Sequence, residues 1–338
     1  MDAVFAPAST DAAIISEMAW VLIAGASLIF GGVMLLMGFS LRRGGSAGAR
    51  SVRPGLWILG GGLLLPVAVL SALMAYNVAR SAQLDPQTSR GALVVSVTAR
   101  MWWWEVRYQD PGGGEDIVLA NEVHLPAGRP VYLALTSADV IHSFWVPALG
   151  GKMDMVPGRM TGLSLRPTKP GVYRGQCAEY CGVQHAKMAL HVVVEPQAGF
   201  DAWLARQARP QPGLFADSAA AADGARLAAG RRVFQQHCAA CHAVRTAATP
   251  VAVTPGATPG ASAAGPAAQL QLAGAGPDLT HVASRLYLAA GTLRNEPGAL
   301  AAWIADPEAH KPGVRMPAAA GIDPAGLQAL AAYLEQLK

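Results

Sequence analysis

The stretch Gln176–Met188 reads QCAEYCGVQHAKM and places two thiols, an imidazole and a thioether within thirteen residues. These groups are typical of a metal site, and a disulfide loop would use only part of the set. A strand-like segment, GVYRG at 171–175, precedes it, and a second, LHVVVE at 190–195, follows it. The stretch is therefore predicted to be a loop between two strands of a β domain. A second imidazole, His142, is predicted to lie on another loop at the same end.

The mixture of donors narrows the choice of metal. Zinc would be satisfied by two thiolates and two imidazoles and has no use for a thioether, whereas soft sulfur donors favour copper. A mononuclear blue-copper site needs only one cysteine. Two thiolates can bridge two copper ions, each with one imidazole, and leave the weak positions to the thioether and a backbone carbonyl. The stretch thus favours a dinuclear copper centre, with a lone zinc site as the alternative.

The composition indicates that part of the chain lies in a membrane, because 52% of the 338 residues are hydrophobic and only 14% are charged. Two apolar stretches, 14–39 and 56–76, each reach the roughly 20 residues needed to cross a bilayer as a helix. Buried helices of a soluble core are the alternative. Four arginines lie between them, within 42–53, while no Lys or Arg precedes Glu17. The positive-inside rule then predicts a cytoplasmic loop and places everything after Tyr76 outside.

Changes in composition and hydrophobic periodicity along the chain predict the domain organisation. Residues 1–90 form an N-terminal segment and a two-helix transmembrane hairpin, whose first span is interpreted as retained because it lacks a basic leader region. Short β-type runs predict an all-β domain over 91–196. A helix and linker follow over 197–222, and helical periodicity predicts an α-rich domain over 223–338. Its Ala/Pro/Gly/Thr tract at 246–274 is predicted to be a flexible insertion. The net charge of +4 is not clustered in a way that indicates nucleic-acid binding.

A second cofactor is indicated by QHCAACH at 236–242, which contains the haem attachment pattern CxxCH. In this pattern Cys238 and Cys241 form thioether bonds to the haem, and His242 binds the iron. Met316 is the only methionine after the motif and is predicted to be the second axial ligand, with His281 and His310 as competitors. Because both cysteine pairs lie among other ligand-type residues, structural disulfides are the weaker alternative.

The copper stretch, with HSFWV at 142–146 and KxDxxPGR at 152–159, resembles subunit II of haem-copper cytochrome c oxidases. The resemblance covers the hairpin and the β domain, and it implies a cupredoxin-like Greek-key fold. It implies a dinuclear CuA centre with the ligands His142, Cys177, Glu179 (through its carbonyl), Cys181, His185 and Met188. The Glu179 carboxylate would also face a magnesium or manganese ion at the contact with subunit I.

Three consecutive tryptophans, Trp102 to Trp104, lie in MWWWEVRY at 101–108. On a strand, Trp102 and Trp104 would share one face and Trp103 would take the other. Core packing explains at least two of the three rings. The resemblance implies that Trp102 lies at the surface where a donor delivers electrons.

The order CxxCH, GPDL at 276–279, MP at 316–317 and a C-terminal helix resembles class I cytochrome c, an all-α domain. This implies that the carbonyl of Pro277 holds His242. Together, the parts resemble subunit II of a caa-type oxidase, in which cytochrome c is fused to the copper domain. The chain would then relay electrons from cytochrome c or a quinol-cytochrome c reductase, through haem c and the copper pair, to subunit I. There oxygen is reduced to water, coupled to proton pumping.

The resemblance further implies a complex with subunits I and III in a bacterial plasma (inner) membrane, with both cofactor domains on the periplasmic side. This subunit should carry no acid, base or nucleophile of its own. It departs from the family in one respect, because Asp85 is the only acidic residue between Leu41 and Met101. The glutamate that usually stands near the start of the second helix, beside a proton route, is therefore missing.

Rival functions fit the sequence less well. Quinol oxidase subunits II lack the copper ligands, and a nitrous oxide reductase needs a histidine-rich cluster that the five remaining histidines cannot build. A membrane-anchored copper and haem redox carrier or sensor outside an oxidase complex is the alternative from another class. Of the other histidines, His124, His191 and His237 are predicted to be structural.

Overall fold

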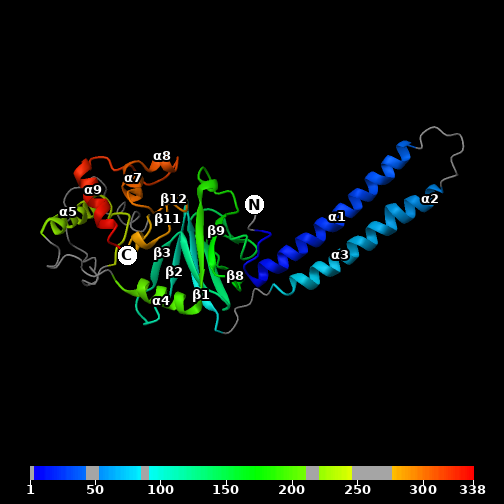
Figure 1. Cartoon of the computed structure of the whole chain (residues 1–338), viewed down its shortest axis with the longest axis horizontal. Helices are drawn as coiled ribbons and strands as arrows, with labels where there is room; N and C mark the ends of the chain where they lie inside the picture. Colours follow the sequence, from blue (N-terminus) through cyan, green and yellow to red (C-terminus); the bar gives the residue numbers. More distant parts are fainter. Residues whose placement is uncertain (1–3, 43–52, 85–90, 211–220, 246–275) are drawn as a thin grey trace.

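The computed structural model describes residues 4–42, 53–84, 91–210, 221–245 and 276–338. Figure 1 shows a long helical hairpin, two β sheets and an α-rich C-terminal part. Most of the arginine-rich loop, part of the linker after residue 210 and the insertion predicted at 246–274 lie outside the described residues. The predictions made for those segments stay predictions.

Two helical segments form the hairpin (Figure 1). Helix α1 spans Thr10–Arg42, and the second segment runs through α2 (Pro54–Leu56), the π-helix η1 (Trp57–Leu64) and α3 (Leu65–Ser81). By length and composition, both are able to cross a membrane. Their large apolar side chains are exposed along most of their length, as lipid-facing side chains would be. Near the β domain, Glu17 of α1 pairs with Arg80 and accepts a hydrogen bond from Tyr76 of α3.

The residues just before α1 are bound to the β domain. The Ala8 amide donates to the Ala148 carbonyl over 2.8 Å, and the Ser9 hydroxyl donates to the Leu149 carbonyl over 2.6 Å. The Thr168 amide in turn donates to the Ala8 carbonyl over 2.8 Å. The start of α1 therefore lies at the end of the hairpin that adjoins the β domain.

The β domain contains two five-stranded sheets, ordered β3-β2-β1-β5-β8 and β4-β10-β9-β6-β7. Their strands are β1 (Leu93–Arg100), β2 (Trp103–Tyr108), β3 (Ile117–Ala120), β4 (Glu122–Pro126), β5 (Val131–Ser137), β6 (His142–Trp145), β7 (Met153–Met155), β8 (Thr161–Leu165), β9 (Gly171–Cys177) and β10 (Ala189–Glu195). Most neighbouring strands pair antiparallel, but β1 with β5 and β10 with β4 are parallel. Parallel neighbours cannot be joined by a simple hairpin and need crossover connections. This topology fits the predicted cupredoxin-like fold, and that prediction is confirmed.

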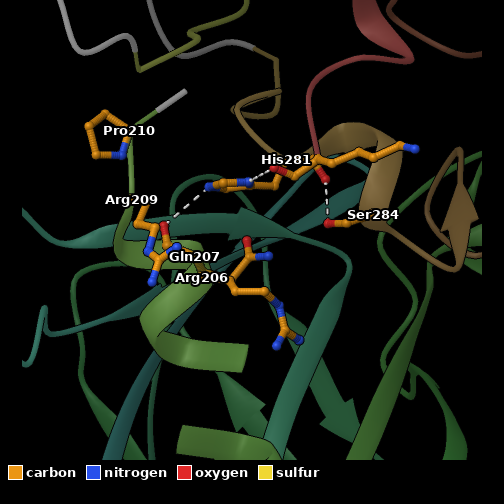
Figure 2. A pocket seen from close by; sticks show the side chains of 7 residues that line it. Arg206, Gln207, Arg209, Pro210, His281 and Ser284 are labelled. Carbon is orange, nitrogen blue, oxygen red and sulfur yellow. Dashed lines mark hydrogen bonds between the residues drawn. The ribbon is translucent and has the colours of Figure 1, made fainter. Parts of the chain in front are cut away.

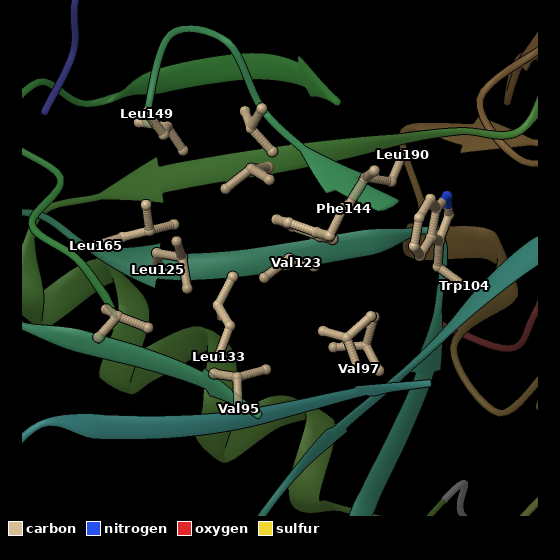
Figure 3. Packing of buried hydrophobic residues seen from close by; sticks show 14 of the residues in the cluster. Val95, Val97, Trp104, Val123, Leu125, Leu133, Phe144, Leu149, Leu165 and Leu190 are labelled. Carbon is tan, nitrogen blue, oxygen red and sulfur yellow. The ribbon is translucent and has the colours of Figure 1, made fainter. Parts of the chain in front are cut away.

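The core lies between the two sheets (Figure 3). Alternation along β1 directs Val95 and Val97 inward, and the same alternation along β5 buries Leu133. Near one end the Trp104 and Phe144 rings meet edge to face, with centroids 5.7 Å apart. The side chains of Cys177, Cys181 and Met188 belong to the same buried cluster. The predicted metal ligands therefore rest directly on the packed core.

Helix α4 (Gln197–Ala208) closes one side of the β domain. Its Trp203 ring, 7% exposed, stacks on the His124 imidazole with centroids 3.9 Å apart and packs against Tyr108. Both nitrogens of His124 lie 3.0 Å from a carboxylate, one from Glu122 and the other from Glu195. His124 is thus a fully partnered structural residue.

The C-terminal domain is mainly helical, as predicted. Its described elements are α5 (Ala221–His237), η3 (Val282–Ser284), β11 (Tyr287–Leu288), β12 (Leu293–Arg294), α7 (Ala299–Ala305), α8 (Pro307–His310) and α9 (Pro324–Leu334). Helices α5 and α9 cross at Gly230, where a Cβ atom would lie 2.8 Å from the Tyr333 Cβ. Only glycine allows so close an approach. The Asp323 side chain caps α9 by accepting from the Gly326 amide over 2.7 Å.

Candidate metal and cofactor sites

The two thiols of the copper stretch lie side by side on the core. Cys177 ends β9, Cys181 follows in the loop, and their Sγ atoms are 3.8 Å apart, far beyond a disulfide bond. The Nδ1 atom of His142 lies 3.8 Å from the Cys177 sulfur, and the Nδ1 atom of His185 lies 3.7 Å from the Cys181 sulfur. Each thiol therefore has its own imidazole.

Two weaker donors complete the cluster. The Glu179 carbonyl oxygen lies 3.1 Å from the Cys177 sulfur, and the Met188 thioether lies 3.9 Å from the Cys181 sulfur. The structure thus brings together every residue predicted as a copper ligand. Its donor atoms, two sulfurs with imidazoles, a thioether and a carbonyl, suit a soft metal such as copper.

The two thiols differ in pKa. The contact with Cys181 lowers the pKa of Cys177, although burial alone would raise it. The same contact raises the pKa of Cys181. One thiolate therefore forms readily, and a cation that binds both sulfurs would displace the second proton.

The prediction that His142 lies on a loop was wrong, because His142 is the first residue of strand β6. The segment HSFW is rich in residues that favour strands, and it pairs with β7 and β9. Sequence reasoning also missed Asp139, whose carboxylate lies 2.8 Å from His142 Nε2 and accepts from the Met101 amide over 2.7 Å. With Nε2–H donating to this carboxylate, Nδ1 is left as the ligand atom. The spacing DVIH, three residues apart, was the available signal.

Burial would raise the pKa of Asp139, but hydrogen bonds from His142 and from the amides of Met101 and Val140 lower it. Asp139 therefore stays ionised beside a fully buried imidazole. The carboxylate fixes the direction of the ring and makes it a better electron donor to a metal.

Of the three tryptophans, Trp102 touches the copper loop. Its Nε1 atom donates to the Cys181 carbonyl over 2.8 Å. Trp104 is buried in the core, and Trp103 packs in a separate small cluster. A Cβ atom at Gly182, whose φ is +111°, would lie 3.1 Å from the Trp102 ring. The glycine therefore allows the ring to lie against the loop.

The Glu179 carboxylate is half-exposed and lies 3.8 Å from the Lys152 ammonium, which lies equally close to Asp154. The magnesium or manganese ion at this carboxylate stays a prediction. A hollow of about 480 Å³ adjoins Lys152, between the start of α1 and the β6–β7 connection.

The haem motif lies directly after α5, in a turn closed by a hydrogen bond from the Cys241 amide to the Cys238 carbonyl. The Nδ1 atom of His242 lies 2.8 Å from the Pro277 carbonyl oxygen, in the arrangement predicted for these two residues. Burial lowers the pKa of His242, which keeps the ring neutral as iron ligation requires. With Nδ1 fixed in this way, Nε2 is the atom that remains to bind iron.

The candidates for the second axial ligand differ in their surroundings. Both nitrogens of His281 face carbonyls, at 2.8 Å from Lys338 and 3.2 Å from Gln207, beside a hollow of about 550 Å³ (Figure 2). His310 lies near Trp303 instead. Met316 packs against the same hydrophobic cluster as Cys238. These contacts favour Met316, whose role stays a prediction.

Two family models match the chain in the order that the domains suggest. The model of the periplasmic domain of cytochrome c oxidase subunit II matches residues 112–196, and that of cytochrome c matches residues 227–338. They imply binding of copper and of haem c.

Similar proteins of known identity include cytochrome c oxidase subunits 2 from two bacteria. That of Alkalihalophilus pseudofirmus is 34% identical over 256 residues, which cover 75% of this chain and 64% of the relative. That of Bacillus sp. strain PS3 is 32% identical over 284 residues, which cover 82% of this chain and 71% of the relative.

Solved structures that resemble the chain include the periplasmic domain of cytochrome oxidase subunit II from Bradyrhizobium japonicum. It is 29% identical, with a TM-score of 0.33, over 36% of this chain and 96% of that domain. A haem-copper terminal oxidase dimer gives 25% identity and a TM-score of 0.32, over 40% of this chain and 98% of the matched chain. From the two family models and the long match to the Bacillus relative, it follows that this chain belongs to the cytochrome c oxidase subunit II family, in the form that carries a C-terminal cytochrome c domain.

Proposed function

We propose that this chain is the subunit of a haem-copper terminal oxidase that receives electrons from an external donor and relays them to subunit I. The relay runs through haem c and a dinuclear CuA centre, and subunit I reduces oxygen to water with proton pumping. The observation that carries the proposal is the pair of free thiols 3.8 Å apart, each beside its own imidazole. A mononuclear site would leave one thiol without a role.

When bound, the copper pair and haem c supply one-electron redox chemistry. The contribution of the protein is a site whose ligand positions stay constant. The Cys177 amide donates to the Met188 carbonyl over 3.0 Å, and the Ala178 amide donates to the Ser143 carbonyl over 2.9 Å. These bonds join the two ends of the copper loop to each other and to β6. A rigid ligand frame lowers the reorganisation that accompanies each electron transfer.

In the haem domain, the protein attaches and orients the group. Cys238 and Cys241 would hold the haem covalently, while the Pro277 carbonyl fixes the direction of His242. Met316 would complete the iron coordination with a thioether, which raises the reduction potential relative to a second imidazole.

The two apolar helices support a position in the membrane. Two apolar helices anchor the chain, and the family description of the β domain as periplasmic supports an orientation with both cofactor domains outside a bacterial inner membrane. Subunit I would contact the membrane side of the copper domain, where Glu179 would share a magnesium or manganese ion with it. Subunit III is a further partner, and the donor is cytochrome c or a quinol-cytochrome c reductase. Without a carboxylate near the start of the second helix, subunit I must supply the proton route.

Electron paramagnetic resonance of the oxidised, purified complex tests this proposal. We expect hyperfine coupling to two equivalent copper nuclei, and its loss in both Cys177→Ser and Cys181→Ser. Coupling to one nucleus, or the same spectrum in either variant, would refute the dinuclear centre. A large polytopic partner should copurify with the chain. Its absence would favour a membrane-anchored redox carrier or sensor instead.

A further inference from the structure

A buried network of charged side chains leads from His124 in the β domain to the surroundings of the predicted iron ligand. We propose that the proton on His124 raises the reduction potential of haem c through Glu122 and Arg285, so that the haem responds to the pH outside the membrane. The inference rests on the proposed function, because it specifies how the haem step of the relay is regulated.

The network begins at His124, a histidine that is only 7% exposed. Its Nδ1 atom lies 3.0 Å from the Glu195 carboxylate, and its Nε2 atom lies 3.0 Å from the Glu122 carboxylate. A neutral imidazole donates from one nitrogen only, so the protonated ring alone satisfies both carboxylates. Burial would lower the pKa of His124, but these two hydrogen bonds raise it above 6.5. His124 therefore changes charge in a range where a histidine can act as a switch.

The proton of this buried imidazole exchanges with water through Glu195, whose side chain is 27% exposed. The hydrogen bond from His124 lowers the pKa of Glu195 against the effect of burial, and the nearby charge of Arg206 on α4 lowers it further. The Tyr108 hydroxyl donates to the His124 carbonyl over 2.9 Å, and burial raises the pKa of Tyr108. Glu195 therefore stays ionised and Tyr108 stays neutral, so the proton that titrates belongs to His124.

Glu122 connects His124 to the haem domain. One of its carboxylate oxygens lies 3.0 Å from His124, and the other accepts a hydrogen bond from the Leu286 amide over 2.8 Å. Leu286 follows Arg285, which is only 8% exposed. Burial lowers the pKa of Arg285, while the negative charges of Asp278 and Glu122 oppose that shift. The Glu122 carboxylate is therefore near enough for its charge to act on Arg285.

Arg285 in turn acts on the surroundings of His242. Its guanidinium donates to the Asp278 carbonyl, and the preceding carbonyl, that of Pro277, lies 2.8 Å from His242 Nδ1. Burial lowers the pKa of His242, and the positive charge of Arg285 lowers it further. Charges interact strongly in a buried site of low dielectric constant. Because oxidised haem carries one more positive charge than reduced haem, Arg285 favours the reduced state and a higher potential.

The direction of the pH effect follows from these charges. When His124 is protonated, its positive charge offsets that of Glu122, and Arg285 acts on the haem without opposition. When the proton leaves, Glu122 offsets part of the Arg285 charge and stabilises the oxidised haem. The potential should therefore fall as the pH rises through the raised pKa of His124. Conversely, protons that accumulate outside would make haem c hold its electron more tightly, which slows delivery to the copper pair.

A second histidine near Glu122, His191, responds in a different pH range. Its imidazole stacks on the Tyr287 ring with centroids 3.8 Å apart. Burial lowers the pKa of His191; the charge of Glu122 opposes this shift without reversing it, and the charge of Arg174 adds to it. His191 therefore cannot supply a change of potential above pH 6.5.

A spectroelectrochemical titration of haem c in the purified complex, at a series of pH values on both sides of 6.5, tests the inference. In the wild type the potential should fall above pH 6.5 and then level off at a lower, alkaline value. In His124→Gln this step should be absent, and the potential should stay near the alkaline value of the wild type. Glutamine can still bind a carboxylate, but it brings no positive charge to offset Glu122.

A second variant acts in the opposite direction. Glu122→Gln keeps an acceptor for the Leu286 amide but removes the charge that opposes Arg285. Its potential should stay at or above the acidic value of the wild type across the whole range. Residues with a purely structural role would not shift the potential in opposite directions. Glu115→Gln, which neutralises an exposed carboxylate of the same domain, is the control and should keep the wild-type profile.

The inference and the proposed function fail in different ways. A wild-type potential that stays constant above pH 6.5, or a step of the same size in His124→Gln, would overturn the link between His124 and the haem. In either case electrons can still pass from haem c to copper, and the relay stands. If haem c passes no electron to the copper pair in the wild type at any pH, the relay itself is wrong.

Discussion

Replacing Gly276 by alanine should displace the histidine that is predicted to bind iron. A Cβ atom at this position would lie 2.5 Å from Cε1, 2.8 Å from Nδ1 and 2.9 Å from Nε2 of His242. Ordinary contacts between non-bonded heavy atoms are about 3.5–4.0 Å. Gly276 cannot move away easily, because its amide donates to the Cys241 carbonyl over 3.1 Å.

The imidazole must therefore withdraw by roughly 1 Å to reach an ordinary contact distance. Such a shift breaks the 2.8 Å hydrogen bond between Nδ1 and the Pro277 carbonyl. Loss of a buried hydrogen bond that leaves one partner unsatisfied costs about 1–3 kcal/mol. The ring would also lose the direction that Pro277 imposes on it.

Denaturant unfolding of the purified complex, followed by haem absorbance, measures the change in stability, and a redox titration measures the haem potential. We expect Gly276→Ala to lower the unfolding midpoint and to shift the potential. Gly199→Ala is the matched control, because Gly199 lies within helix α4 and its Cβ would lie 3.6 Å from the nearest atom, the Glu195 Cβ. This control should be neutral or slightly stabilising. Unchanged stability and potential in Gly276→Ala would refute the packing argument.

Three further predictions concern the copper domain. Asp139→Ala should lower copper affinity by about 10–100-fold, because the substitution removes the carboxylate that orients the predicted ligand imidazole. A copper titration against a competing chelator measures the affinity, and an unchanged affinity would contradict this role of Asp139. Trp203→Ala should lower the free energy of unfolding by about 3–5 kcal/mol, because it removes the ring that packs α4 against the β domain. A loss below about 1 kcal/mol, measured by denaturant unfolding, would contradict this packing. Burial alone would lower the pKa of His124, but the hydrogen bonds that its ring nitrogens donate to Glu122 and Glu195 raise it above its ordinary value of 6.5. The protonated form therefore stabilises the fold below that value, and this contribution is lost as the pH rises through the raised pKa. Unfolding measured across this range should show a steeper loss in the wild type than in His124→Gln, and parallel profiles would speak against the ion pair.

The sequence was most informative where chemistry depends on residue type and local spacing. The predicted ligands between Cys177 and Met188 are close in sequence, so a single loop suffices to bring them together. The CxxCH motif and Pro277 were also recognisable, because each occurs in a short pattern of fixed order. The apolar helices were predictable from length and composition alone.

Features that depend on long-range packing were not predictable in this way. The assignment of His142 to a loop failed because a strand of four residues gives too short a pattern to distinguish from a turn. The carboxylate of Asp139 gains its role only once β6 and the chain before Trp102 are adjacent. The contact of Lys311 with Trp102 joins residues 209 positions apart, and no local pattern encodes such a pair.

The bonds made by Ala8 and Ser9 have a consequence for assembly. Besides its covalent link to the hairpin, the β domain is bonded to the residues that precede α1. A domain attached at one point can rotate about that point, whereas a domain attached at two points keeps its orientation. The outer domain should accordingly present the same side toward the lipid surface before any other subunit joins it, so that docking requires little reorientation.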